Sequence, residues 1–223
     1  IVLIYLVYPD IVRRSMSLFG CKSFDDDKSY LRADFEVECW SEEHTRYALT
    51  VGLMGLLFWG IGFPLGGFFL LRKSWMSTSH TEIRMKYGYL VNGYKEEYYY
   101  WEAVLAYRKV IIAFISVFLA GIDSGVQALF GILFLLACLY IHLINRPFID
   151  NTLNSLETIS LFVVIMTLWC GLLIYGGNVS RAGDIFLFTL IALLNFWFVG
   201  LWLSRFSREF IANLKETQPK CFA

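Results

Sequence analysis

The chain has 223 residues, of which 57% are hydrophobic and 17% are charged, and its formal net charge is zero. Soluble domains usually carry about a quarter charged residues, so this composition predicts an integral membrane protein. The balanced charge argues against a nucleic-acid-binding protein, which needs an excess of basic residues.

Residues 1–20 begin with an apolar run, Ile1–Tyr8, that has neither Met nor a basic leader. We expect a partial membrane helix in a fragment of a longer protein, because a signal peptide would start differently. After this run, Asp10 precedes Arg13 and Arg14 by three and four positions, which places the three side chains on one helix face. This charged cluster predicts either a neutralised pair at the membrane surface or charges along an ion path.

Residues 21–46 form the longest polar segment between apolar runs and contain Cys21 and Cys39. We expect an extracellular loop closed by a disulfide between these cysteines, because such bonds persist in oxidising compartments. The acidic run of this loop consists of Asp25, Asp26 and Asp27. These residues are weak candidates for binding a divalent cation, which prefers carboxylate ligands, and a solvated charge run is the alternative.

Five further apolar runs predict five complete membrane helices, so that residues 1–223 form one multi-pass, all-α integral membrane domain. The expected helices cover residues 47–71, 103–121, 126–144, 153–176 and 184–204. Residues 72–100 are basic and aromatic, which is typical of a connector at the cytoplasmic membrane surface. Docking of a cytosolic partner is the alternative for this connector. Residues 205–223 are expected to form a cytoplasmic tail.

Basic residues indicate the orientation of these helices. Residues 72–109, which extend the connector to Arg108 and Lys109, hold 12 of the 19 basic residues together with the turn around Arg146 and the tail. This count predicts that these segments face the cytoplasm. The disulfide loop then lies outside, together with the glycosylation candidate Asn178 of the sequon Asn178-Val-Ser180. We expect the protein in the plasma membrane or a ciliary membrane.

Charged residues near the inner helix ends predict structural ion pairs, because unpaired charges are costly there. They are Glu102, Arg108, Lys109, Arg146 and Glu157. The sequence contains no Cys-x-x-Cys, His-Glu-x-x-His, Gly-x-Ser-x-Gly or phosphate-binding glycine motif. We therefore expect no enzymatic activity, no catalytic residue, no metal and no cofactor.

Several stretches carry a family resemblance. They are Tyr8-Pro9, Leu18–Cys21, Ser29–Asp34, Ile61–Leu65, Tyr87–Lys95, Tyr100–Glu102, Arg108-Lys109, Asn145–Phe148 and Leu153–Glu157. Together they resemble the multi-pass C-terminal membrane region of large protist and algal cell-surface proteins with Cys-rich or EGF-like extracellular repeats. Such proteins are described as similar to transient receptor potential (TRP) channels. The resemblance implies a large ectodomain before residue 1, and a cation channel or channel subunit.

A TRP-type pore needs a re-entrant helix and a filter between its last two helices. Here eight residues, 176–183, join those helices, too few to enter the membrane and return. The alternative is a non-conducting membrane anchor or receptor-like domain that holds a large extracellular assembly at the cell surface. Apolar residues on both helices predict a dry contact between them: Leu161, Val164, Leu168, Leu190 and Leu194.

The expected partners follow from these two alternatives. They are the lipid bilayer, the ectodomain and N-terminal helices of the same chain, and extracellular structural partners or other membrane subunits. No nucleic acid is expected.

Overall fold

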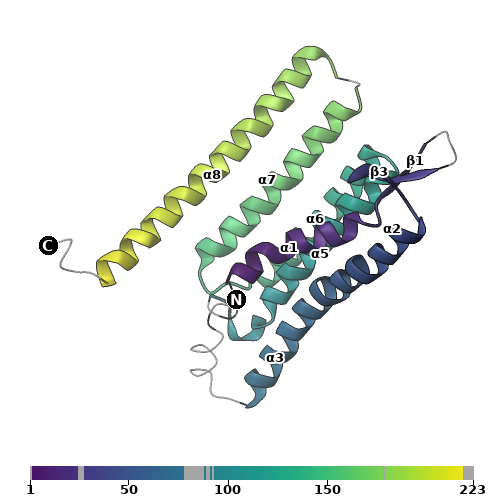
Figure 1. Ribbon diagram of the computed structural model, residues 1–223. Helices are drawn as coiled ribbons and strands as arrows, with labels where there is room; N and C mark the ends of the chain where they lie inside the picture. The colour runs from purple at the N-terminus through teal and green to yellow at the C-terminus, as the bar shows by residue number, and fades with distance from the viewer. Residues whose placement is uncertain are drawn as a thin grey trace. The chain divides into compact units, whose positions relative to one another are not determined.

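The computed structural model describes residues 2–24, 28–77, 88, 91, 93–177 and 179–217. These residues are mostly helical (Figure 1). The chain divides into two compact units, residues 1–131 with 147–150, and residues 132–146 with 151–223. Helix α6 (Ser124–Asn145) begins in the first unit and ends in the second.

Five helical stretches among the described residues are long and apolar enough to cross a membrane. They are Glu42–Lys73, Trp101–Gly121, Ser124–Asn145, Asn151–Tyr175 and Arg181–Ile211. The shortest has 21 residues, and about 20 are needed to cross the hydrocarbon layer. Helix α1 (Val2–Ser17) is shorter and continues through Pro9. In length and composition these elements agree with one partial and five complete helices.

Helix α1 lies at the centre of the first unit, against α5 (Trp101–Phe118) and against the long helix that contains α3 (Phe63–Ser77) (Figure 1). A spacing of four residues places three large α1 side chains on one face. The buried residues of this core are Tyr8, Val12, Met16, Ala106 and Ala113. The two alanines of α5 are small enough for the helix backbones to approach closely.

The long helix starts with α2 (Glu42–Tyr47), five residues before the expected boundary at 47. The Oγ atom of Ser41 accepts a hydrogen bond from the backbone N–H of His44 at 3.3 Å, which caps the helix start. Glu42 and Glu43 follow in the first turn, where carboxylates favour the helix dipole. The helix therefore begins in the polar segment rather than at the first apolar residue.

Two π-helical stretches, Ala48–Leu53 and Leu56–Gly62, precede α3. Pro64 has no N–H to donate to a carbonyl one turn back, so an ordinary α-helical ladder is interrupted at that residue. The N–H of Phe63 instead donates to the carbonyl of Phe58, five residues earlier. The wider turn accommodates the proline without ending the helix.

The expectation of an all-α chain is wrong in the polar loop. Strands β1 (Cys21–Ser23), β2 (Ser29–Leu31) and β3 (Asp34–Glu38) form an antiparallel sheet in the order β1-β2-β3. Cys21 lies opposite Leu31, and the register shifts between β2 and β3. Strands of three to five residues are too short for an alternating hydrophobic pattern to reveal them. Residues 21–46 are called the disulfide module below.

Part of the expected connector, residues 78–87, 89, 90 and 92, lies outside the described residues. Its last part is held by backbone hydrogen bonds within the first unit. The N–H of Lys95 donates to the carbonyl of Pro147 at 2.9 Å, and that of Ile149 donates to Gly93 at 2.9 Å. The rings of Tyr94 and Phe148 stack between these bonds, with centroids 4.9 Å apart.

The second unit contains the end of α6, α7 (Asn151–Tyr175) and α8 (Arg181–Thr217). Its core is the contact of α6 with α7, formed by Ile132, Leu135, Leu161 and Ile165. Helix α8 continues beyond the expected end at 204, so the first part of the expected tail is helical. No Gly or Pro occurs between Gly200 and Pro219, and nothing in that stretch breaks the helix.

Candidate functional site

The disulfide module is closed by the predicted bond between Cys21 and Cys39, whose Cα atoms are 6.4 Å apart. The bond joins the first residue of β1 to the residue that follows β3. Cys39 is buried. Closing a loop of this length is expected to stabilise the module by about 3 kcal/mol, mainly by restricting the unfolded chain.

His44 connects the module to the end of α1. Its Nδ1 atom accepts a hydrogen bond from the backbone N–H of Trp40 at 3.1 Å. Its Nε2 atom lies 3.0 Å from the carbonyl of Leu18. Because Nδ1 accepts, Nε2 carries the proton and donates to that carbonyl. Trp40 has a φ of 65°, a strained conformation for a large side chain, and this hydrogen bond helps to hold it.

A hollow of about 430 Å³ lies beside this histidine in the first unit. Apolar residues and carboxylates both line it. The apolar part is Leu18, Leu31, Val37 and Tyr47, and the acidic part is Asp34, Glu36, Glu38 and Glu43. Nζ of Lys28 lies 3.0 Å from Oε2 of Glu38 and neutralises one carboxylate. The surface of the hollow is therefore acidic.

The proposed cation ligands Asp25, Asp26 and Asp27 lie outside the described residues. Within the described ranges, no group of three or more His, Cys, Asp or Glu side chains could hold a metal ion. The glycosylation candidate Asn178 also lies outside the described residues.

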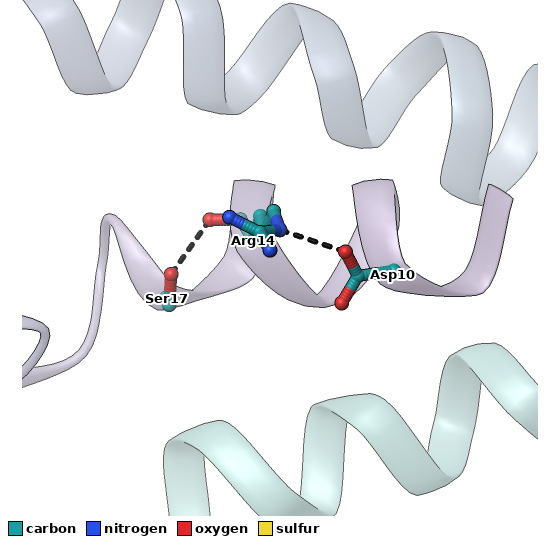
Figure 2. Close-up of polar contacts among 3 residues, drawn as sticks. All are labelled: Asp10, Arg14 and Ser17. Carbon is teal, nitrogen blue, oxygen red and sulfur yellow. Dashed lines mark hydrogen bonds and ion pairs between the residues drawn. The ribbon is translucent and has the colours of Figure 1, made fainter. Parts of the chain in front are cut away.

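The charged cluster of α1 contains one ion pair, shown in Figure 2. Nε of Arg14 donates to Oδ2 of Asp10 at 2.7 Å, and the hydroxyl of Ser17 donates to the carbonyl of Arg14 at 2.7 Å. Both charged side chains are more than half exposed, and Arg13 is exposed as well. Asp10 and Arg14 therefore form the expected pair, and its location at the membrane surface stays a prediction.

The charged residues expected near the inner ends of the helices lie in both units. In the first unit, Oε2 of Glu102 accepts a hydrogen bond from the hydroxyl of Tyr94 at 2.8 Å. Nζ of Lys109 lies 6.0 Å from the ring centre of Tyr8, and the Tyr8 hydroxyl donates to the carbonyl of Ala106 at 2.8 Å. Arg108 belongs to the same helix, α5. Ion pairing of Glu102, Arg108 and Lys109 stays a prediction.

In the second unit, Arg146 follows the end of α6 and Glu157 lies in the second turn of α7. Nε2 of the buried His142 lies 3.1 Å from the carbonyl of Asn154 and joins these two helices. Nη1 of Arg205 lies 3.4 Å from Oγ1 of Thr152, which connects α8 to the start of α7.

The contact of α7 with α8 includes a polar pair. Nδ2 of Asn195 donates to Oγ1 of Thr167 at 3.0 Å and to the carbonyl of Ile191 at 2.9 Å. Leu161 and Leu168, expected to face α8, instead belong to the core with α6, and Val164 is 45% exposed. Residue spacing identifies an apolar face but not which of two neighbouring helices it meets.

Sequence reasoning missed the roles of His44 and Tyr8, which connect segments distant in the chain. The pattern Ser41-Glu42-Glu43-His44 carries a helix-start signal that could have placed His44 in the first turn of a helix. No sequence signal indicated that its ring contacts Leu18, because that contact depends on the fold. The same holds for the bond from Tyr8 to Ala106.

In sequence, the chain is similar to two cysteine-repeat proteins. The chain is 29% identical over 212 residues to cysteine repeat modular protein A of Toxoplasma gondii, covering 89% of this chain and 7% of that protein. It is 33% identical over 129 residues to cysteine repeat modular protein B of the same organism, covering 55% of this chain and 2% of that protein.

The chain therefore spans less than a tenth of the length of these curated relatives. No protein-family model, of TRP type or any other, matches the chain. No solved structure matches it. The names of the relatives agree with the expected likeness to Cys-rich proteins, and the TRP-like part of the expectation has no support from these comparisons.

Proposed function

We propose that the chain is a multi-pass membrane domain that anchors a larger cysteine-rich protein at the cell surface, with the disulfide module outside. The observation that carries the proposal is the attachment of this module to the helices. The Cys21–Cys39 bond closes the sheet, and His44 ties the start of α2 to the end of α1. A force on the module would thus reach two helices at once.

The comparisons support this proposal because the chain matches only a small part of each relative. The similarity to cysteine repeat modular protein A extends over most of this chain and a small part of that protein. Five apolar helices hold far more strongly in a bilayer than a lipid anchor does. The proposal includes no enzymatic activity, and the plasma or ciliary membrane is the proposed location.

Replacing residues 1–223 in the full-length protein by an unrelated single-pass helix tests the anchoring role. An anchor predicts that surface biotinylation and the cellular role of the protein are both retained. A control that lacks any membrane helix should be released into the medium. Retained surface display with loss of the cellular role would contradict a role limited to anchoring.

A cation channel is the second candidate, and the two π-helical stretches Ala48–Leu53 and Leu56–Gly62 favour it. Such turns occur frequently at functional sites of helices. The test is recording from the purified full-length protein in planar bilayers. Reproducible single-channel currents, absent from protein-free bilayers, would favour the channel over the anchor.

A further inference from the structure

A second hollow, of about 350 Å³, lies at the ends of α6 and α7 in the second unit. Its polar side is formed by Arg146, Asn151, Ser155 and Thr158, and its apolar side includes Leu143 and Ile159. We propose that this hollow binds an anionic phospholipid of the membrane surface, with the headgroup phosphate on Arg146. The proposal rests on the membrane-spanning role proposed above.

Arg146 supplies the charge. Its backbone N–H donates to the carbonyl of His142 at 2.9 Å, and its φ of 40° ends the helix there. The side chain is exposed, and within the described ranges its guanidinium makes no hydrogen bond or ion pair. A guanidinium presents several N–H donors in a fork that fits phosphate oxygens.

The hydroxyl groups in the hollow select the kind of headgroup. Oγ of Ser155 donates to the carbonyl of Asn151 at 2.9 Å, and Oγ1 of Thr158 donates to that of Asn154 at 2.8 Å. Because both hydroxyl protons are donated to backbone carbonyls, the two oxygens can only accept hydrogen bonds from a ligand. A headgroup with hydroxyl or ammonium donors satisfies them, whereas choline has no such donor.

The position of the hollow fits a lipid rather than a free anion. Helix α6 has 22 residues, about 33 Å, so Arg146 at its end lies at headgroup depth if the helix crosses the bilayer. Leu143 and Ile159 extend the hollow away from the charge along the two helices. Basic pockets between membrane helices bind acidic lipid headgroups in this way.

The experiment is native mass spectrometry of the full-length protein in detergent, titrated with phosphatidylserine, phosphatidylglycerol and phosphatidylcholine. The wild type should bind the two anionic lipids at least tenfold more tightly than phosphatidylcholine, about the factor that a charged hydrogen bond supplies. Arg146→Ala should remove this preference, and Arg146→Lys should retain part of it. The matched control Arg181→Ala removes an exposed arginine at the start of α8 and should leave binding unchanged.

Equal binding of all three lipids, or an undiminished preference in Arg146→Ala, would overturn the proposal. Displacement of the lipid by millimolar inorganic phosphate would show that the hollow recognises a free anion instead. Circular dichroism establishes that each variant is folded, and Arg146→Gln replaces Arg146→Ala if the latter is not. Bilayer recording tests the proposed function separately, since conduction by the wild type would leave these lipid affinities unaffected.

Discussion

Gly55 offers a direct test of how α1 packs in the first unit. A Cβ atom added to Gly55 would overlap Oγ of Ser15 and lie 3.2 Å from Cβ of the same residue. Ser15 is buried in α1, so its short side chain has little room to move. We expect Gly55→Ala to destabilise the protein by about 1–2 kcal/mol, the usual cost of overpacking reduced by the better helix propensity of alanine.

The assay is thermal unfolding of the detergent-solubilised full chain, followed by circular dichroism. The matched control is Gly67→Ala, because nothing lies within 4 Å of a Cβ atom at Gly67. This control should be neutral or slightly stabilising. Ser15→Ala removes the overlapping Oγ atom, so combined with Gly55→Ala it should cost less than the sum of the two single changes, with a coupling energy of about 1 kcal/mol. Full stability of Gly55→Ala with no coupling to Ser15 would refute the packing of α1 described above.

Three further predictions concern other contacts. Replacing Cys21 and Cys39 by serine should lower the free energy of unfolding of the module by about 3 kcal/mol, measured by hydrogen exchange, and unchanged protection would contradict this. Tyr8→Phe should cost about 1 kcal/mol in thermal unfolding by removing its bond to the α5 backbone, whereas equal stability would show that the bond contributes nothing. Asn195→Ala and Thr167→Ala should leave bilayer currents at the level of protein-free controls, as for the wild type. If the wild type conducts ions and these substitutions alter its ion selectivity, the result would instead support a pore at α7 and α8.

Apolar runs were enough to predict the five long helices, because runs of about 20 apolar residues have the length and composition of helices that could cross a bilayer. The helix ends were less accurate. Helix α8 runs to Thr217 since a helix need not end where the hydrocarbon layer does. The start of α2 at Glu42 depends on the Ser41 cap, a local signal that an apolar run does not contain.

The disulfide could be predicted because two cysteines occur in one polar segment, which is typical of an oxidising compartment. The sheet that it closes could not be predicted. Strands as short as β1 and β2 are stabilised by their partners and by the Cys21–Cys39 bond rather than by their own pattern. The hollow near Arg146 also depends on tertiary structure. Its residues come from two helix ends that meet only in the folded second unit.

The accessibility of two epitope tags in intact cells tests whether the chain is a multi-pass membrane domain with the disulfide module outside. One tag is inserted at Ala33, in the exposed turn between β2 and β3, and the other follows Ala223. Antibody is expected to bind the tag at Ala33 in intact cells and the tag after Ala223 only after permeabilisation. Binding to both tags in intact cells, or the reverse pattern, would contradict a multi-pass domain with the disulfide module outside.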